Sequence, residues 1–424
     1  MQKLTRRDFV KGTVAAGLTL AAPFSRVRGA NDEVRLAAVG FNDRGEKLIG
    51  QFLNAQGVRI VALCDVDDHV IARQVDKFKK RNEQVTVYTD YRKMMEDESI
   101  DAVCIATPDH HHVPAAALAV IAGKDVYLEK PAGHTITEGR LLVKLARKCN
   151  RIVQHGTQSR SSEGVREGIK FVKSGKLGKC RMAKAIDSQR REKIGHFEDE
   201  PAPSNVHYDL WLGPAPKKPF NRNRFHYNWH WWWDYGAGDI ANDGVHEIDI
   251  GRWGLGVELP KAVCCSGRQL WYDDDHETPD TQTATFEYDD CYLVYEMRLW
   301  APYRHEGVEN GVIFYCDDGW VSIGRKAWEA YSADGRKVAG GSREWNAAHV
   351  ENFLKAVRSR TTDDLTADID VGHYSSALAH MANIAMRVGR RLHFDRAAER
   401  FVGDAEANRY LTKEYRKGWE LPQV

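Results

Sequence analysis

The sequence predicts an α/β protein with two folded domains. The first is a doubly wound parallel sheet, and the second is an α/β unit whose later strands pair in an antiparallel sheet. At 424 residues the chain is too long for one ordinary hydrophobic core. Between residues 34 and 155 apolar strands and amphipathic helices alternate regularly, which predicts parallel strands joined by crossover helices. Beyond residue 262, short alternating segments are separated by turn signals such as Asp289-Asp290 and Asp334-Gly335, which predicts antiparallel pairing.

The first domain is expected to span residues 31–155. Its strands are expected at residues 34–40, 58–64, 85–88, 102–106 and 151–155, with another running from residue 125 into Glu129. Its helices are expected at residues 44–55, 69–80, 91–96, 113–122 and 137–149, where apolar residues recur at helical spacing. In such a sheet ligands bind at the carboxyl ends of the strands.

The second domain is expected to span residues 156–424. A helix at residues 165–172 and a strand at 180–186 precede a loop-rich stretch at 193–227. Strands are expected at residues 262–270, 281–288, 292–299, 312–316 and 320–323, and amphipathic helices at 349–357 and 373–389. If the helices cover one face of this sheet, the other is free for self-association, so we expect a homo-oligomer.

Composition and charge exclude several classes of protein. The chain has 61 Lys+Arg against 60 Asp+Glu, a net charge of +1, which gives no reason to expect a nucleic-acid partner. Hydrophobic residues make up 42% of the chain and are too dispersed for a stable membrane span. The eight cysteines show no metal-ligand spacing, so we expect neither a metal site nor a structural disulfide.

The N-terminus carries an export motif. Thr5-Arg6-Arg7-Asp8-Phe9-Val10-Lys11 fits the twin-arginine pattern, and the apolar run from Gly12 to Ala22 is too short to span a bilayer permanently. We therefore expect residues 1–30 to be a signal peptide read by the twin-arginine export machinery, and the protein to be periplasmic or in the cell envelope. This route moves folded proteins, commonly with a cofactor already in place, so we expect a tightly retained cofactor.

The first strand leads into a turn that resembles a dinucleotide fingerprint. In Gly40-Phe41-Asn42-Asp43-Arg44-Gly45 the outer glycines of G-x-G-x-x-G are present, while Asn42 replaces the middle one. Asparagine tolerates left-handed dihedral angles better than most residues, so the turn can survive. Asp65 ends the second strand, where a carboxylate accepts hydrogen bonds from a ribose and repels a 2′-phosphate. The candidate cofactor-binding residues here are Gly40, Asn42, Arg44, Gly45 and Asp65, and the expected cofactor is NAD rather than NADP.

Two further strand ends carry candidate residues. Thr107, Pro108 and His112 belong to a predicted turn that lines the cofactor cleft. The run His110 to His112 does not predict a metal site, because successive side chains diverge. The stretch Glu129-Lys130-Pro131 ends the fifth strand, where a lysine can hold a substrate oxygen or exchange a proton with it. On these residues alone, a surface ion pair beside a turn is the alternative.

Taken together, these motifs resemble the glucose–fructose oxidoreductase / inositol dehydrogenase / MocA (Gfo/Idh/MocA) family from about residue 33 onward. The resembling segments are Gly40 to Gly45, Asp65, Ala106-Thr107-Pro108 with His112, Glu129-Lys130-Pro131, Gly156 to Arg160, Trp211 to Pro216, Gly238-Asp239 and Gly244 to Asp249. The resemblance implies an N-terminal Rossmann domain and a C-terminal α/β domain with a large, open, mainly antiparallel sheet. The nicotinamide would lie between the two domains. Family members mostly act on sugars, polyols and their derivatives.

The resemblance also implies roles for individual residues. The lysine matching Lys130 binds the reacting oxygen and assists proton transfer, and the peptide bond matching Lys130-Pro131 is often cis. A histidine matching His246 often pairs with an aspartate four positions earlier, but Asn242 stands there and an amide cannot ionise. Three acids could orient His246 instead, namely Asp239, Asp243 and Asp249. The catalytic candidates are Lys130, His246 and Asn242, with more weight on Lys130.

The substrate-contact candidates lie in the second domain. They are Arg160, Tyr235 and Asp243. Tyr235 ends an aromatic run, Tyr227 to Tyr235, which we expect to be divided between the core and a sugar-binding cleft. Glu129 is assigned to the cofactor side with Thr107, Pro108 and His112.

These observations predict an exported NAD-dependent oxidoreductase acting on CH–OH groups of a sugar, polyol or glycoside. With NAD retained, either a second sugar takes the hydride back, or transient oxidation ejects a glycosidic group before re-reduction. NAD-dependent glycosidases resembling this family follow the second course. A non-catalytic sugar-binding protein on the same fold is the alternative from a different class, favoured by Asn42 and Asn242 and opposed by the intact Glu129-Lys130-Pro131.

Overall fold

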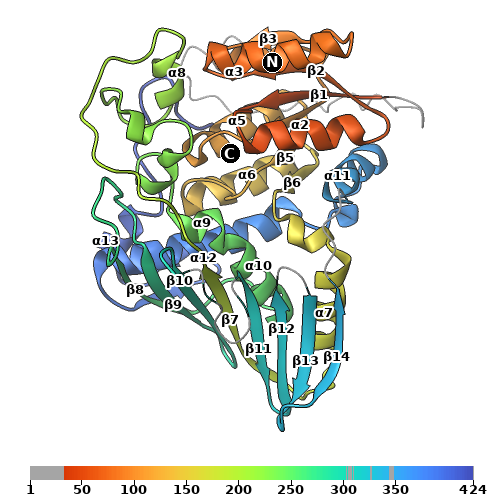
Figure 1. Cartoon of the computed structure of the whole chain (residues 1–424), viewed down its shortest axis with the longest axis vertical. Helices are drawn as coiled ribbons and strands as arrows, with labels where there is room; N and C mark the ends of the chain where they lie inside the picture. The colour runs from red at the N-terminus through yellow and green to blue at the C-terminus, as the bar shows by residue number, and fades with distance from the viewer. Residues whose placement is uncertain are drawn as a thin grey trace.

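The computed structural model describes residues 33–301, 303, 308, 310–324, 327–342 and 348–423. In Figure 1 a parallel sheet with its helices forms the upper part, and a second, larger sheet forms the lower part. The predicted signal peptide, residues 1–30, lies outside the described residues and stays a prediction. No helix among the described residues is long and apolar enough to cross a membrane.

The first domain contains a six-stranded parallel sheet with the strand order β3-β2-β1-β4-β5-β6. The strands are β1 (Val34–Val39), β2 (Val58–Cys64), β3 (Thr86–Tyr88), β4 (Ala102–Ile105), β5 (Asp125–Leu128) and β6 (Val153–His155). The predicted doubly wound sheet is confirmed. Because the chain builds outward from β1 in both directions, the topological switch point lies between β1 and β4, where such sheets bind ligands.

The helices of this domain are α2 (Arg44–Asn54), α3 (Asp68–Lys80), α4 (Tyr91–Met94), α5 (Asp109–Ile121) and α6 (Ile136–Lys148). One prediction was wrong: residues 109–112 are the first turn of α5, not part of a turn that precedes it. The prediction began the helix at Val113. In the structure Pro108 precedes the helix, and the extra turn is held by His110 and His111, whose rings both reach the carbonyl of Trp211.

The second domain contains a ten-stranded sheet with the order β14-β13-β12-β11-β7-β10-β9-β8-β15-β16. Its pairs are antiparallel except for β7 with β10, which are parallel. The strands are β7 (Cys180–Ser188), β8 (Ala262–Arg268), β9 (Thr281–Glu287), β10 (Tyr292–Arg298), β11 (Asn310–Cys316), β12 (Gly319–Gly324), β13 (Ala327–Ser332), β14 (Lys337–Ser342), β15 (Leu392–Asp395) and β16 (Arg400–Phe401). The predicted open, mainly antiparallel sheet is confirmed.

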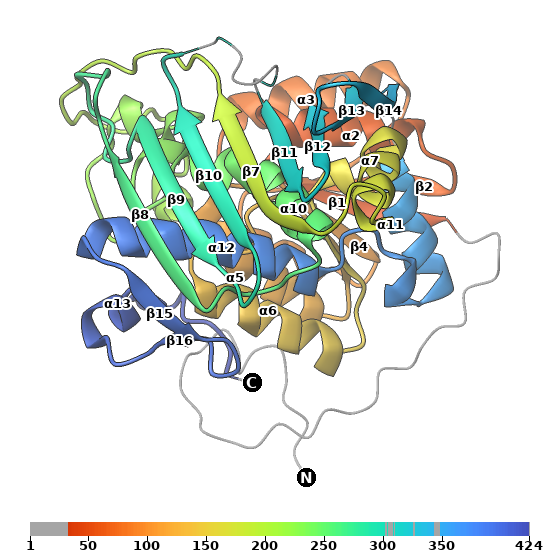
Figure 2. The ribbon, with the colours of Figure 1, turned by 90° about the horizontal axis from the view of Figure 1, so that it is seen from below.

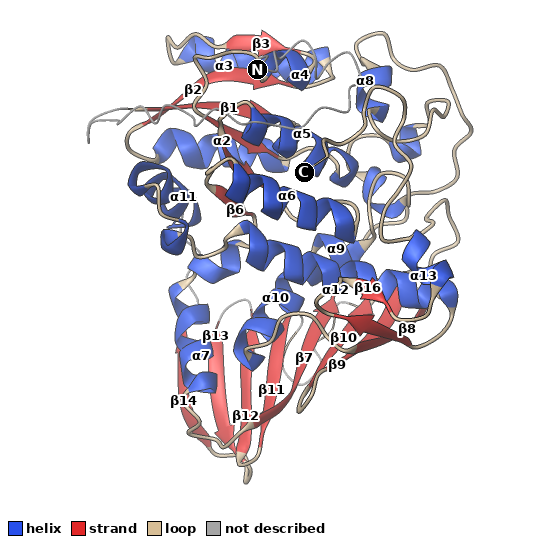
Figure 3. Cartoon of the chain, turned by 180° about the vertical axis from the view of Figure 1, so that it is seen from behind, coloured by secondary structure: helices blue, strands red, loops and turns tan. Residues whose placement is uncertain are grey.

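Two helices lie between this sheet and the first domain, α10 (Gly244–Leu255) and α12 (Ile369–Val388) (Figure 3). Figure 2 looks onto the other face of the sheet and shows its strands in front of both helices. Close packing needs glycine: a Cβ at Gly254 would come within 2.2 Å of the Phe314 ring. The sheet thus positions α10, whose N-terminal end carries His246.

The remaining α-helices follow the first domain in the chain. They are α7 (Glu163–Lys173), α8 (Tyr208–Leu212), α9 (Asp239–Asn242), α11 (Ala348–Ser359) and α13 (Ala405–Arg409). Although α11 comes late in the chain, it packs on the first domain, where Phe353 contacts the rings of Phe52 and Tyr127 edge-on. This contact fixes one domain against the other.

Candidate active site

A cavity of about 350 Å³ lies at the carboxyl ends of the parallel strands, where the second domain meets the first. Most of the predicted residues line it: Gly40, Asn42, Arg44, Asp65, Thr107, Pro108, His112, Glu129, Lys130, Asn242, Asp243 and His246. The cavity has two ends. We call the part at β1 and β2 the cofactor end, and the part around Lys130, Asn242 and His246 the reactive end.

The fingerprint turn depends on its two glycines. Gly40 has a φ of +73°, and a Cβ there would lie 2.9 Å from the Ala106 oxygen. Gly45 does not line the cavity, yet a Cβ on it would lie 1.9 Å from the oxygen of Gly40. Asn42 does not adopt the left-handed conformation considered from the sequence. Its side-chain oxygen instead accepts a hydrogen bond from Arg73 at 3.0 Å, which explains how this turn accommodates asparagine.

Asp65 lies beside this turn at the end of β2. Its carboxylate accepts hydrogen bonds from the backbone N–H groups of Phe41 at 2.9 Å and Val66 at 2.8 Å. Burial raises the pKa of Asp65 to about 6, although these donors oppose the shift. At neutral pH the group is therefore a carboxylate at the position that accepts ribose hydroxyls.

Glu129 is already paired. Its Oε1 accepts a hydrogen bond from Nε of Arg44 at 2.6 Å, which ties the end of β5 to the start of α2. Burial alone would raise the pKa of Glu129, but the charges of Arg44 and Lys130 outweigh it and hold the pKa at about 2. This ion pair positions the residue next to Lys130.

The ammonium group of Lys130 donates to Oδ1 of Asn242 at 2.5 Å. Nδ2 of Asn242 in turn donates to Asp239 at 2.7 Å, and Asp239 forms an ion pair with Arg191 at 2.9 Å. The amide is therefore fixed in one orientation, with its oxygen toward the lysine. The peptide bond between Lys130 and Pro131 is cis, as the family resemblance implied.

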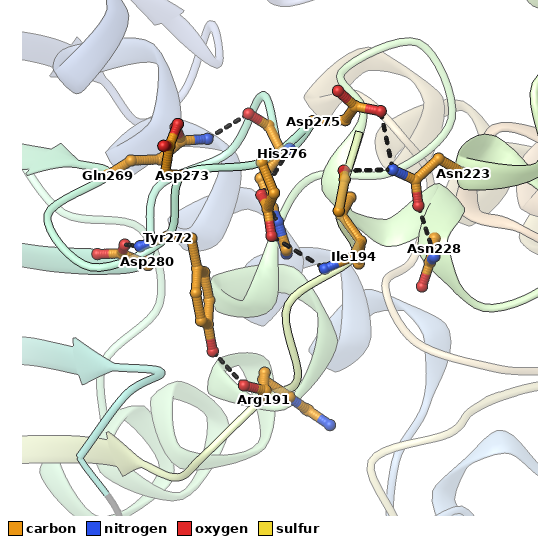
Figure 4. A network of polar contacts seen from close by, with 12 residues as sticks. Arg191, Ile194, Asn223, Asn228, Gln269, Tyr272, Asp273, Asp275, His276 and Asp280 are labelled. Atoms are coloured by element: carbon orange, nitrogen blue, oxygen red, sulfur yellow. Dashed lines mark hydrogen bonds and ion pairs between the residues drawn. The ribbon is translucent and has the colours of Figure 1, made fainter. Parts of the chain in front are cut away.

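Arg191 connects this chain of contacts to a loop network. Its guanidinium also pairs with Asp243 at 3.0 Å, and the charge of Arg191 outweighs burial and lowers the pKa of Asp243. Figure 4 shows Tyr272 directed at Arg191, whose backbone carbonyl accepts a hydrogen bond from the tyrosine hydroxyl. The same figure shows Asn223 bonded to Asp275, so the loops beside the cavity are held by polar contacts. Arg191 and these loop contacts thus hold Asn242 and Asp243 in place beside the cavity.

His246 lies on the cavity wall at the start of α10. Its Nδ1 is buried and has no hydrogen-bond partner among the described residues. Burial, reinforced by the positive charge of Lys130, lowers its pKa to about 4, despite the nearby Asp243 and Glu129. The ring is therefore neutral near pH 7 and able to accept a proton.

None of the three acids considered from the sequence is paired with His246. Asp239 and Asp243 pair with Arg191, and Asp249 forms two hydrogen bonds with Arg160 at 2.7 and 2.9 Å. The helix also breaks at Asp243, between α9 and α10, so the spacing of four residues does not give a continuous helix face.

Two of the predicted substrate-contact residues do not line the cavity. Tyr235 is fully buried at 0% exposure, and its ring packs on Trp211 at 4.7 Å, because its place in the aromatic run turns it into the core. Arg160 is buried, and its positive charge is paired with the carboxylate of Asp249 inside the second domain. Gln158, two residues before Arg160, lines the cavity in its place.

The aromatic run is divided as predicted. Trp231, Trp232 and Tyr235 are buried in the core, whereas Tyr227 and Trp229 line the cavity. The sequence reasoning missed Gln158 and Trp419 as lining residues. Gln158 lies in a segment that the reasoning did single out, but Trp419 stands near the end of the chain without any local motif.

The cavity fits a dinucleotide on an observation independent of sequence motifs. Three lining residues present buried polar atoms with no partner among the described residues: Thr107 Oγ1, Gln158 Oε1 and His246 Nδ1. Buried polar groups are normally hydrogen-bonded, so such atoms beside one cavity indicate a polar ligand. Within the described part of the chain, no group of His, Cys, Asp or Glu residues could hold a metal ion.

Comparison with known families decides the classification. A model of an oxidoreductase family's NAD-binding Rossmann fold matches residues 34–157, and the model of its C-terminal alpha/beta domain matches residues 189–295 and 343–421. The chain belongs to the Gfo/Idh/MocA oxidoreductase family. Among the residues proposed for the reactive end, Asn242 departs from the pattern expected of this family.

The individual relatives are either distant in sequence or match only part of this chain. A glycosyl hydrolase family 109 protein from Shewanella sp. (strain W3-18-1) is 32% identical in an alignment of 177 residues, which covers 36% of this chain and 39% of that protein. The match therefore spans well under two thirds of that relative. The WlbA dehydrogenase from Bordetella pertussis, solved with NADH and UDP-GlcNAcA, has a TM-score of 0.66 at 18% identity, covering 86% of this chain and 99% of that one. The aldose-aldose oxidoreductase from Caulobacter crescentus, complexed with glycerol, also has a TM-score of 0.66, at 17% identity, covering 85% and 100%.

Proposed function

We propose that this member of the Gfo/Idh/MocA family is an NAD-dependent enzyme that transfers hydride at a CH–OH carbon of a sugar, polyol or glycoside. The observation that carries the proposal is the convergence of Lys130 and neutral His246 on the cavity that the fingerprint turn also lines. Lys130 is a hydrogen-bond donor that Asn242 holds in place. The Nδ1 atom of His246 is an acceptor without a partner among the described residues. Oxidation of a substrate hydroxyl group needs both a hydrogen-bond donor to its oxygen and an acceptor for its proton.

The cofactor end would hold NAD. Backbone N–H groups of the turn at Gly40 and the N-terminus of α2 would meet the pyrophosphate, and Asp65 the ribose. The bound nicotinamide supplies the hydride acceptor. A carboxylate at Asp65 supports NAD over NADP, because it repels a 2′-phosphate. The Bordetella neighbour, solved with NADH, is consistent with this choice.

The reactive end would handle the proton. Lys130 would donate a hydrogen bond to the substrate oxygen and stabilise negative charge as the C–O bond gains carbonyl character. His246 would accept the hydroxyl proton, since its ring is neutral at neutral pH. Asn242 would keep the lysine in place without changing its own charge. Tyr227 and Trp229 offer aromatic surface for a sugar ring.

A redox-neutral glycosidase is the second candidate. The similarity to glycosyl hydrolase family 109 proteins favours it. In that reaction, transfer of hydride from a ring carbon to NAD acidifies the C–H bond on the neighbouring carbon. Loss of that proton expels the glycosidic group as an alcohol, water adds to the resulting double bond, and hydride returned from NADH to the ring carbon regenerates NAD. The sequence motif for twin-arginine export supports either candidate, because an exported enzyme needs a cofactor that is restored within each cycle. The proposal includes a periplasmic or cell-envelope location and a homo-oligomer.

A substrate screen tests the proposal. Sugars, polyols and aryl glycosides are mixed with the protein, and both nicotinamide absorbance and released aglycone are followed. Transient NADH formation with aglycone release supports the glycosidase, and absorbance change alone supports the dehydrogenase. Sugar binding with neither signal for any compound, unchanged by Lys130→Ala, would favour a non-catalytic sugar-binding protein.

A further inference from the structure

The end of the chain returns to the first domain as a strap, which we define as residues 411–421. It begins at α6, where the backbone N–H of Thr137 donates to the carbonyl of Leu411 at 3.0 Å. Lys413 and Tyr415 then both contact Glu138, at 3.0 and 2.7 Å. These contacts hold the strap along the first domain, although the strap follows the last helix of the second.

Near its end the strap carries a tryptophan side chain, that of Trp419, which lines the cavity. Trp419 is only 9% exposed, and it lines the cavity together with Tyr91 and His111. Its ring meets both edge-on, with centroids 6.0 and 5.7 Å apart. The guanidinium of Arg92 lies 4.0 Å above the ring centroid. The ring is therefore held from several sides.

Arg92 is itself fixed. Asp90, another lining residue, accepts three hydrogen bonds from the Arg92 guanidinium, at 2.7 to 3.1 Å. Three residues before Trp419 in the strap, Arg416 forms an ion pair with Asp209 at 2.6 Å. The backbone N–H of Arg416 also donates to the carbonyl of Pro214. The position of Trp419 is thus set by both domains.

The location identifies the part of the ligand that Trp419 would meet. Asp90 and Tyr91 follow β3, which lies beside β2 in the sheet, and Asp65 directly follows β2. Lys130 lies on the other side of β1, after β5. In a dinucleotide-binding sheet the acid after β2 takes the adenosine ribose. Trp419 therefore belongs to the adenosine side of the cavity, away from the chemistry.

We propose that Trp419, carried by the strap and held by Arg92, forms the wall of the adenosine end of the dinucleotide site and slows release of NAD. This inference rests on the proposed NAD dependence. A tryptophan ring beside an adenine adds an aromatic contact worth about tenfold in affinity. Because the strap spans both domains, release of the adenosine half requires the strap to move or the ligand to pass it.

Binding of half-ligands tests this inference without relying on activity. Trp419→Ala, Trp419→Phe and wild type, each freed of cofactor, are titrated with NADH, ADP-ribose and nicotinamide mononucleotide by calorimetry. We expect Trp419→Ala to bind NADH and ADP-ribose about tenfold more weakly, with nicotinamide mononucleotide unchanged, and to release NADH about tenfold faster. Trp419→Phe should recover most of the affinity. The control is Trp271→Ala, which removes a ring that is 54% exposed.

The outcomes separate this inference from the function on which it rests. If wild type binds neither NADH nor ADP-ribose, the proposed function itself fails. If wild type binds both and Trp419→Ala matches it within twofold, only the role of Trp419 is overturned. Equal weakening of all three ligands by Trp419→Ala, with Trp419→Phe no better, would also overturn it, because that pattern is a general folding defect.

Discussion

The two ends of the cavity are built in different ways. At the cofactor end the turn is set by backbone geometry at Gly40 and Gly45, and Asp65 already accepts hydrogen bonds from backbone N–H groups. At the reactive end, side chains from both domains meet, and His246 keeps an atom without a partner among the described residues. This difference agrees with the proposal that one end holds the cofactor and the other exchanges a proton with the substrate. Substitutions should therefore separate binding from turnover.

Removal of the lysine should have the largest effect. Lys130→Met keeps the length of the side chain but removes its hydrogen bond to Asn242 and its charge. We expect kcat to fall by about a thousandfold, the range expected when a proton-transfer and charge-stabilising group is lost. NAD content should stay at the wild-type level, because the cofactor end is untouched.

The matched control is Lys79→Met, an exposed lysine on α3. It should leave both turnover and NAD content unchanged. Steady-state kinetics and assay of NAD(H) released from denatured protein measure the two quantities. If Lys130→Met loses NAD and activity in parallel, the division of the cavity into two ends is wrong.

Replacement of the histidine should have the next largest effect. His246→Gln keeps a hydrogen-bonding group but no proton acceptor of similar basicity, so we expect kcat to fall about a hundredfold. Because burial lowers the pKa of His246 to about 4, wild-type activity should fall only as pH drops through that value, where the ring becomes protonated. The variant should lose this acid limb. An acid limb that is identical in the variant would assign it to another group.

Stability should respond to pH through the histidines between the domains. Burial lowers the pKa of His155 to about 3 and those of His349 and His380 to about 4, below the ordinary 6.5. Their contribution is therefore complete above pH 6.5 and is lost as pH falls toward 4, each by up to about 3 kcal/mol. Asp65, whose pKa is raised to about 6, has the opposite sign between pH 3.8 and 6.

Urea denaturation between pH 7 and pH 4 measures this difference in the free energy of unfolding. His380→Gln should reduce the slope, because it removes one group that takes up a proton only on unfolding. A profile that is flat over this window, or one that rises toward acid pH, would contradict the assignment of neutral buried rings.

Substitution of Asp65 should have the smallest effect, which we expect on the preference between the two cofactors. Asp65→Ser removes the charge that repels a 2′-phosphate while keeping a hydroxyl for the ribose. We expect NADH to bind about tenfold more weakly and the preference for NADH over NADPH to shrink by a similar factor, with the sugar specificity unchanged. Calorimetric titration with both cofactors checks this. An unaltered NADH/NADPH ratio would show that Asp65 does not read the ribose.

The sequence predicted the framework better than the contacts within it. Hydrophobic periodicity located the parallel strands closely, with β2 at the limits observed, because these strands consist mainly of apolar residues and β4 and β5 are buried along their whole length. Strand ends then placed Asp65 and Lys130 on one edge. The start of α5 was misplaced, because Pro114 falls inside the helix and contacts from Trp211 hold the turn before it.

Two predicted site residues lie away from the cavity for a common reason. Arg160 and Tyr235 were chosen by position within a motif, but a partner distant in sequence decides whether such a side chain faces the cavity, as Asp249 does for Arg160. The support of Asn242 by Asp239 and Arg191, and the arrival of Trp419 at the end of the chain, likewise depend on contacts between segments far apart. Local patterns carry no information about these contacts.

The central claim is that the cavity holds NAD for hydride transfer at Lys130. The most direct test is to mix the purified, NAD-loaded protein with a substrate deuterated at its CH–OH carbon and to follow nicotinamide absorbance in a single turnover. The account predicts NADH formation that deuterium slows and that Lys130→Met abolishes while its NAD remains bound. Turnover of the substrate with no nicotinamide signal and no isotope effect, or a wild type that binds no NAD, would contradict it.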